Sequence, residues 1–153
     1  GACLAGSGAD VWYGALKTNC AKFENLADKQ VNKAAERGID PQTRRENDPW
    51  FKYYTYQPKG QGVDDGNMLM VKGGGYQTNP WGLYEMQGNV AEWTRSDYIP
   101  YPYNEKMQGQ GAEKVVRGGS WTDHPKHSTT YYRRGYLPWQ KVYNVGFRVV
   151  IED

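Results

Sequence analysis

The sequence predicts a single α+β domain that is rich in loops and contains short strands and one short helix. Three observations support this prediction. The 153-residue chain contains 19 glycines and 8 prolines, which interrupt regular structure along its length. Its 6 tryptophans and 13 tyrosines outnumber the 3 phenylalanines, so burial must rely mainly on amphipathic rings. The clearest strand patterns lie close to the C-terminus.

The individual elements follow from local patterns. A thin apolar stripe predicts a short helix within Phe23–Arg37. Strands are predicted over 50–58 (WFKYYTYQP), around Met68–Val71, and in the β-branched segments Lys114–Trp121 (KVVRGGSW) and Val145–Glu152 (VGFRVVIE). The remaining segments are predicted to be ordered loops. Loops of this length in a compact domain need buried rings, a bound ion, or both to hold them.

Charge and cysteine content limit the possible partners. The net charge of +2 is nearly balanced, so it implies no nucleic-acid partner. No apolar run approaches the roughly 20 residues that span a bilayer. Cys3 and Cys20 are compatible with a disulfide or with two unpaired thiols, and the lack of a CxxC pair gives no support to a zinc site.

The segment NPWGLYEMQGNVAEW (Asn79–Trp93) combines aromatic rings, glycines and two acids, Glu85 and Glu92. By itself it is compatible with solvent-facing acids beside a packed aromatic turn. It is followed, in order, by VVRGGSW (Val115–Trp121) and NVGFRVV (Asn144–Val150). Together the three segments resemble the motifs of the formylglycine-generating enzyme family, also called the sulfatase-modifying factor family.

The resemblance implies a C-type-lectin-like fold with an antiparallel sheet, one or two bound calcium ions and an extracytoplasmic location (periplasmic, surface or secreted). It also implies that residues 1–153 form one domain whose N-terminal part lies outside this sequence. Calcium takes six to eight oxygen ligands. The resemblance assigns one site to the side chains of Glu85 and Glu92 and the carbonyls of Gly88 and Val90. It assigns a second to Asn25, the Leu26 carbonyl, Asp65 and the Asn67 carbonyl, with Asp64 as an alternative to Asp65.

The resemblance does not extend to catalytic chemistry. The family's enzyme oxidises a substrate cysteine with oxygen, using copper held by two cysteines. In this sequence Asp123 and Ser128 stand at those two positions. Copper(I) selects soft thiolates, so bound copper is not expected. His124 and His127 flank Pro125 in a predicted loop and are expected to be loop histidines rather than metal ligands.

The segment Asp123–Tyr143 mixes tyrosine, tryptophan, arginine and histidine, which are common at binding hot spots. A binding surface is predicted from Ser120, Asp123, His124, Tyr131, Arg133 and Trp139. The alternative is that these rings only pack the loops.

The leading functional prediction is a non-catalytic, calcium-stabilised binding or structural domain. Its partner would be a protein, a peptide, a glycan or the N-terminal part of the family domain. The alternative is a formylglycine-generating oxidoreductase that acts on sulfatase cysteines. The absence of a thiol at Asp123 and Ser128 favours the first.

Overall fold

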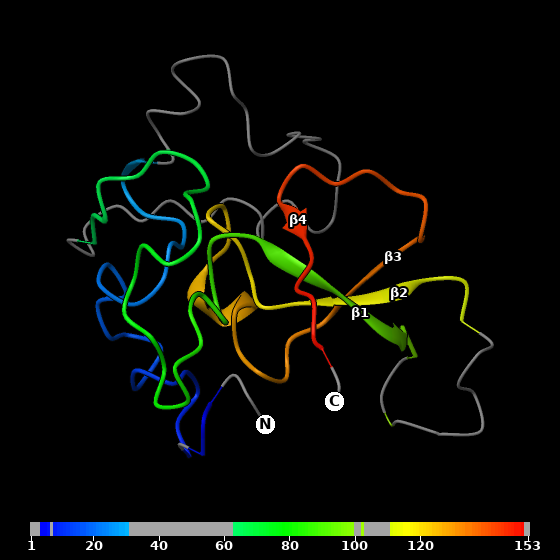
Figure 1. The fold of residues 1–153 in the computed structure, drawn as a ribbon, viewed down its shortest axis with the longest axis horizontal. Coiled ribbons are helices and arrows are strands. Elements are labelled where there is room, and N and C mark those ends of the chain that lie inside the picture. Colours follow the sequence, from blue (N-terminus) through cyan, green and yellow to red (C-terminus); the bar gives the residue numbers. More distant parts are fainter. Residues whose placement is uncertain (1–3, 7, 31–62, 100–101, 103–110, 152–153) are drawn as a thin grey trace.

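The computed structural model describes residues 4–6, 8–30, 63–99, 102 and 111–151. Within them one sheet is formed by β1 (Ala91–Asp97), β2 (Lys114–Arg117), β3 (Arg134–Tyr136) and β4 (Val145–Gly146), in the order β3-β2-β1-β4 (Figure 1). A short 3-10 helix, η2 (Pro125–His127), lies between β2 and β3 in the chain. Most of the described irregular segments that precede β1 lie on one side of this small sheet (Figure 1).

The two central strands define the register of the sheet. β1 and β2 are antiparallel, with Trp93 opposite Val116 and Asp97 opposite Lys114. The register shifts between these pairs, because β1 uses more residues than β2 to cover the same distance. Lys114 donates across the strands to the buried carboxylate of Asp97, which fixes this end of the pair.

The outer strands differ in direction. β3 is antiparallel to β2, with Val115 opposite Gly135. β4 is parallel to β1, with Ala91 opposite Val145. The expected antiparallel sheet is therefore present in β1, β2 and β3, whereas β4 makes the whole sheet mixed.

The core beneath the sheet is small. Ala91, Val115, Val116 and Trp121 are almost completely buried. Among the described residues, buried polar side chains outnumber buried apolar ones. Because buried polar groups must be hydrogen-bonded, networks of polar side chains hold much of the loop structure together.

The predictions for the first half of the chain have different outcomes. Residues 23–29 are irregular and helical structure begins only at Gln30, while residues 31–37 of the predicted helix lie outside the described residues. The strand predicted around Met68–Val71 is absent, and this segment is irregular. The strand predicted over 50–58 lies outside the described residues.

Near the C-terminus the strand predictions are partly confirmed. Lys114–Trp121 contains β2, which ends at a break formed by Gly118 and Gly119, both at positive φ. Of the predicted strand Val145–Glu152, the described residues 145–151 contribute only the two residues of β4. β1 and β3 were not predicted, because AEWTRSD and RGY lack a clear alternation of apolar and polar residues.

Cys20 is a buried free thiol in the structure. Of the two alternatives, a disulfide with Cys3 or an unpaired thiol, the structure has the unpaired thiol at Cys20. Burial raises the pKa of this thiol to about 12, which makes it unreactive at neutral pH. Cys3 lies outside the described residues. In the part of the chain that the structure describes, no helix is both long and apolar enough to cross a bilayer.

Candidate functional site

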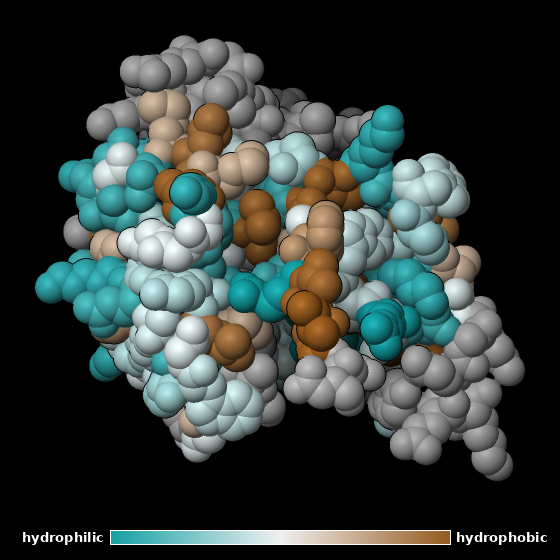
Figure 2. Space-filling model, viewed as in Figure 1, coloured by the Kyte–Doolittle hydropathy of each residue, from teal (hydrophilic) through white to brown (hydrophobic). Residues whose placement is uncertain are grey.

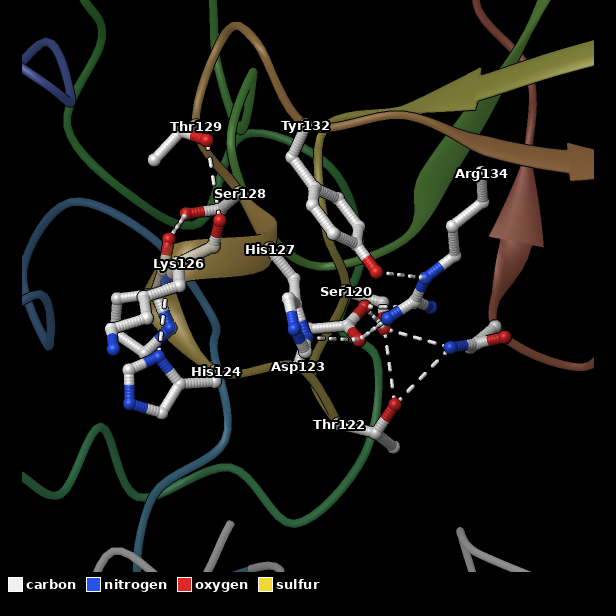
Figure 3. Close-up of polar contacts among 12 residues, drawn as sticks. Ser120, Thr122, Asp123, His124, Lys126, His127, Ser128, Thr129, Tyr132 and Arg134 are labelled. Atoms are coloured by element: carbon white, nitrogen blue, oxygen red, sulfur yellow. Dashed lines mark hydrogen bonds and ion pairs between the residues drawn. The ribbon is translucent and has the colours of Figure 1, made fainter. Parts of the chain in front are cut away.

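Asp123 stands at the first of the two positions where the resemblance implies a copper-binding cysteine. It lies in a polar cluster between the end of β2 and the start of β4 (Figure 3). Its members come from the turn after β2, from η2, from β3 and the residues just before it, and from the residue before β4. This Asp123 cluster consists of Ser120, Thr122, Asp123, His127, Tyr132, Arg134 and Asn144. The cluster thus joins four segments that are separate in the sequence.

The turn after β2 positions the first members. Gly118 and Gly119 have φ values of 97° and 70°, which L-residues with a side chain rarely adopt. A Cβ on Gly119 would lie 2.8 Å from the Cβ of Ser128. The turn therefore requires glycine both for its backbone conformation and for its approach to Ser128.

The carboxylate of Asp123 receives donors on both oxygens. Ser120 Oγ donates to Oδ2 at 2.6 Å. Arg134 donates to Oδ1 through Nη2, and its Nη1 lies 3.4 Å from Oδ2. The His127 Nδ1 atom lies 3.8 Å from Oδ1, an electrostatic contact rather than a hydrogen bond.

The electrostatics of the site favour a buried ion pair. Burial by itself raises the pKa of Asp123, but the contacts with His127 and Arg134 and the hydrogen bond from Ser120 outweigh it. The net pKa of Asp123 therefore lies below its usual value. Burial opposes the charge of Arg134 as well, yet the charge of Asp123 raises the Arg134 pKa. Both groups are consequently charged at neutral pH.

Two further sets of contacts fix this pair. Asn144 Nδ2 donates to Ser120 Oγ at 2.8 Å and to Thr122 Oγ1 at 3.1 Å, so the turn after β2 is tied to the start of β4. On the other side, Arg134 Nε donates to the Tyr132 hydroxyl at 3.2 Å. The His127 ring stacks on Tyr132 with centroids 4.5 Å apart.

Ser128 is hydrogen-bonded to nearby backbone and to Gln87. It is almost completely buried, and its Oγ donates to the Pro125 carbonyl at 2.7 Å. Its own carbonyl accepts a hydrogen bond from Gln87 Nε2 at 2.9 Å. Ser128 therefore closes the C-terminal end of η2 and links it to the segment before β1.

The two histidines face different partners. His124 caps the start of η2, and its Nδ1 accepts a hydrogen bond from the Lys126 backbone N–H at 3.0 Å. Burial lowers the pKa of His124, which favours the neutral ring that this hydrogen bond requires. His127 instead directs its Nδ1 towards Asp123. The histidines contribute to the structure of the turn, and Figure 3 shows their rings pointing to separate places.

The predicted binding surface is only partly brought together. Tyr131 and Trp139 are exposed, with 59% and 77% of their surface accessible. Ser120 and Asp123 are buried inside the Asp123 cluster, so their place on a surface is a wrong prediction. Arg133 is partly buried, donates to the Ile99 carbonyl at 2.8 Å and lies over the Tyr98 ring.

The residues expected at the first calcium site meet hydrogen-bond donors. Glu85 is buried, and its Oε1 accepts from the backbone N–H groups of Gly74 and Gly75, each at 3.1 Å. Both oxygens of Glu92 are taken by Arg148, at 2.8 to 3.2 Å. A cation would have to displace these donors, so this set does not fit calcium in its present arrangement.

The stretch that carries Gly88 is nevertheless packed tightly against the other predicted site. A Cβ on Gly88 would lie 2.8 Å from the Asn25 carbonyl oxygen, so only glycine fits there. The neighbouring Asn89 N–H donates to that same carbonyl at 2.7 Å. The two predicted ligand stretches, 25–26 and 85–92, therefore lie side by side.

The second predicted set lies in a more acidic environment. Asp65 accepts from the Asn67 N–H at 2.7 Å and from the Tyr76 hydroxyl at 2.5 Å. The buried Asp28, which was not predicted, accepts from the Asp65 N–H at 2.8 Å. Burial, and then the charges of Asp65 and Asp64, raise the pKa of Asp28 to about 6. Asp64 is already paired with Lys29 at 2.6 Å, so within this set the neighbouring carboxylates of Asp28 and Asp65 are the better candidates for a cation.

In the described part of the chain, no group of three or more His, Cys, Asp or Glu side chains is arranged to hold a metal ion. Calcium also takes carbonyl and amide oxygens, which such groups do not include. Any calcium site in these segments would rely on backbone oxygens for much of its coordination.

Several residues that organise these sites were not predicted. They are Glu24, Gln87, Arg134 and Asn144. Glu24 is fully buried and accepts from Trp12 Nε1 at 2.8 Å, and its Oε2 has no hydrogen-bond partner among the described residues. Burial raises the pKa of Glu24 to about 8. No local pattern distinguishes these residues from ordinary surface polar residues.

The fold and the site define a loop-rich domain on a small mixed sheet, in which an oxygen-bearing cluster surrounds Asp123. Residues 18–153 match the family model described as "Sulfatase-modifying factor enzyme 1-like domain". The chain belongs to this family. The motif-based resemblance is thereby confirmed.

The relatives include both inactive and active proteins by name. The chain is 36% identical over 97 residues to "Inactive C-alpha-formylglycine-generating enzyme 2" of Mus musculus, covering 60% of this chain and 29% of that protein. It is 32% identical over 95 residues to "Formylglycine-generating enzyme" of Streptomyces coelicolor, covering 56% and 30%. The chain thus spans less than a third of the length of these relatives.

Among solved structures, the chain is similar to "Structure of PvdO from Pseudomonas aeruginosa", with a TM-score of 0.48 and 21% identity. The match covers 80% of this chain and 50% of that one. "Treponema denticola variable protein 1" matches with a TM-score of 0.45 and 24% identity, covering 80% and 45%. The C-type-lectin-like fold stays a prediction.

Proposed function

We propose that this domain is a non-catalytic binding domain of the sulfatase-modifying factor family and does not oxidise cysteine. The observation that carries this proposal is the buried ion pair between Asp123 and Arg134 at the first expected thiol position. A position that binds copper(I) needs a soft, polarizable donor. Asp123 instead presents hard oxygens that already receive hydrogen bonds from Ser120 and Arg134.

The second position supports the same proposal. The Ser128 hydroxyl donates to the Pro125 carbonyl and is buried. A hydroxyl group has no accessible redox chemistry comparable to that of a thiolate. With neither position supplying sulfur, the described residues give the domain no way to hold copper as the resemblance describes.

The rival function is formylglycine generation with catalytic residues supplied from elsewhere. One relative is named as an enzyme and another as inactive, so similarity alone does not decide between the two functions. Fold and family describe a scaffold, whereas activity depends on the site. The chemistry at Asp123 and Ser128 favours the non-catalytic proposal.

The decisive experiment is a turnover assay with a sulfatase-motif peptide, copper and oxygen, followed by mass spectrometry of the peptide cysteine. The Streptomyces coelicolor relative serves as the positive control. We expect full conversion by the control and none by this protein. Copper-dependent conversion to formylglycine by this protein would overturn the proposal.

The binding role rests on exposed rings close to the Asp123 cluster in sequence. Tyr131 precedes the cluster member Tyr132, and Trp139 lies in the loop between β3 and β4. Rigid aromatic side chains bury large areas at little cost in conformational entropy. Our proposal assigns these rings to contact with a protein, peptide or glycan partner.

Binding can be measured with two probes, the same sulfatase-motif peptide and a glycan array. Alanine at Tyr131 or Trp139 should weaken whichever interaction is found by tenfold or more. Alanine at Trp81, which is 58% exposed in a different loop, is the matched control and should leave it unchanged. If neither probe binds, or if the control has the same effect, these rings are not the contact surface.

We also propose that calcium stabilises the domain, with the segment around Asp65 and Asp28 as the preferred location. The support is the proximity of Asp28 and Asp65, whose backbone N–H donates to the Asp28 carboxylate at 2.8 Å, whereas Asp64 is already paired with Lys29. An extracytoplasmic location, which the family resemblance implies, suits such a site, because extracellular calcium sites function with dissociation constants of roughly 10⁻⁴–10⁻³ M. Fractionation of cells that express the tagged protein tests the location.

A further inference from the structure

Residues 69–75 (LMVKGGG) are attached to the domain in an unusual way. This segment, the strap, is irregular and lies against the stretch that carries Glu85 and Asn89. Among the described residues, every hydrogen bond from the strap to another segment involves a side chain of that segment, and none joins two backbones. Three side chains, of Asn25, Glu85 and Asn89, therefore replace the backbone ladder that holds a strand.

The two asparagines hold the first half of the strap. Asn25 Nδ2 donates to the Leu69 carbonyl at 2.9 Å. Asn89 Oδ1 accepts from the Val71 N–H at 2.9 Å, and Asn89 Nδ2 donates to the Val71 carbonyl at 3.0 Å. The Asn89 amide and the Val71 backbone thus exchange two bonds, as a hydrogen-bonded residue pair does in antiparallel strands. This half of the strap has three anchoring bonds.

The second half of the strap closes on a single carboxylate. The N–H groups of Gly74 and Gly75 both donate to Glu85 Oε1, and Glu85 Oε2 lies 3.6 Å from the place that a Cβ on Gly73 would take. Glu85 has a φ of 54°, in the left-handed region that disfavours a residue with a long side chain. The closed strap therefore keeps Glu85 in an unfavourable backbone conformation.

Apolar packing does not replace these bonds at the glycine end of the strap. Residues 72–75 are a lysine and three glycines, which bury little apolar side chain and gain much conformational freedom when released. Figure 2 shows a mainly hydrophilic surface on the side of the molecule where Figure 1 places residues 63–90. Segments with few buried apolar contacts and few backbone ladders open locally at a low cost in free energy.

We propose that the strap opens as a local unit while the sheet stays folded, and that the Glu85 carboxylate is its latch. Opening relieves the unfavourable φ of Glu85 and frees the Glu85 carboxylate together with the side-chain amides of Asn25 and Asn89. These groups belong to the adjacent stretches 25–26 and 85–92. The strap thus controls when their polar side chains are available to a partner, a role that does not depend on the contacts proposed for Tyr131 and Trp139.

Native-state hydrogen exchange of the whole chain, resolved by amide, tests the proposal. In wild type, the amides of Gly74 and Gly75 should exchange through an opening that depends less on urea than the opening of β1 and β2, because it exposes less surface. Glu85→Ala should speed exchange at both glycines by roughly tenfold or more, since hydrogen bonds to a charged group are the stronger ones. Glu85→Gln keeps an acceptor oxygen and should give a smaller increase. Glu92→Gln, the matched control, should leave both glycines unchanged.

A second variant loosens the strap without changing Glu85, and it decides the question if Glu85→Ala does not fold. Gly74 has a φ of 89°, and a Cβ there would meet no atom within 4 Å, so Gly74→Ala strains only the closed backbone. It should speed exchange at Gly75 and leave β1 and β2 unchanged. Unaltered exchange at Gly75 in this variant and in Glu85→Ala would overturn the latch. Equal acceleration in β1 and β2 would overturn local opening, because strap and sheet would then unfold together.

Discussion

Arg134, the first residue of β3, pairs with the buried carboxylate of Asp123 in the turn after β2. The pair is further tied to Ser120 and Tyr132. Two charged side chains thus occupy the interior at the place where the family resemblance implies a thiol. This ion pair therefore connects the turn after β2 to β3 and should stabilise that turn.

Removing one member of this pair should be costly. Arg134→Met leaves the Asp123 charge buried without its main partner, and breaking a buried pair in this way costs about 3–5 kcal/mol. Urea denaturation at neutral pH measures the loss. Arg95→Met, at an exposed position on β1, is the matched control and should change stability by no more than about 0.5 kcal/mol. Equal effects of both variants would show that the ion pair is not stabilising.

The same pair predicts a specific pH dependence. The folded-state pKa of Asp123 lies below its usual value, so its contribution to stability is fully present above the ordinary aspartate pKa of about 3.9. That contribution is lost as the pH falls through the lower folded-state value. Asp123→Asn should be less stable than wild type at neutral pH and should show a shallower acid limb in its stability profile. Parallel profiles would argue against this assignment.

Restoring the two thiols should not by itself restore a copper site. In Asp123→Cys/Ser128→Cys, Arg134 keeps its charge without a carboxylate partner, so we expect the double variant to be less stable than wild type. Adding Arg134→Met should recover much of that stability. Competition with a copper(I) chelator should reveal tighter binding in the triple variant than in the double variant. A stable double variant with tight copper binding would show that Arg134 does not constrain this position.

Calcium dependence separates the two predicted ligand sets. An ion that binds only the folded state stabilises it by about 2.7 kcal/mol at a hundredfold excess over its dissociation constant. A chelator should therefore lower the melting temperature of the wild type, and Asp65→Asn should remove that sensitivity. Glu92→Gln should retain it, because Arg148 already occupies the Glu92 carboxylate. The opposite pattern would favour the first set, and an insensitive wild type would rule out both.

Exposed and buried rings should respond differently to alanine. Tyr131→Ala and Trp139→Ala should leave the melting temperature nearly unchanged, because both rings are largely exposed. Trp121→Ala should cost about 3–5 kcal/mol, because that ring is almost completely buried. Thermal melts of the three variants, under identical conditions, provide the comparison. A large drop in the melting temperature of Tyr131→Ala would instead support the alternative that this ring packs the loops.

Local patterns in the sequence were sufficient for part of the fold. The β-branched run and the two glycines predicted β2 and the break at Gly118 and Gly119, because both depend on backbone preferences of adjacent residues. They did not predict β1, whose seven residues show no clean alternation. This strand lies between β2 and β4 and contains a register shift, so its environment differs from that of a strand with one face in solvent.

The sequence by itself determined the family, through three ordered motifs, and the absence of sulfur at Asp123 and Ser128. Only the tertiary structure decided what those positions do instead and which acids are free to bind an ion. Arg134 reaches Asp123 from 11 residues away, and Arg148 reaches Glu92 from 56 residues away. Motifs record residue types and short spacings, whereas side-chain partners depend on which distant segments the sheet and turns bring together. For that reason the residue types at the site could be predicted from the sequence, whereas the particular partners of their side chains could not.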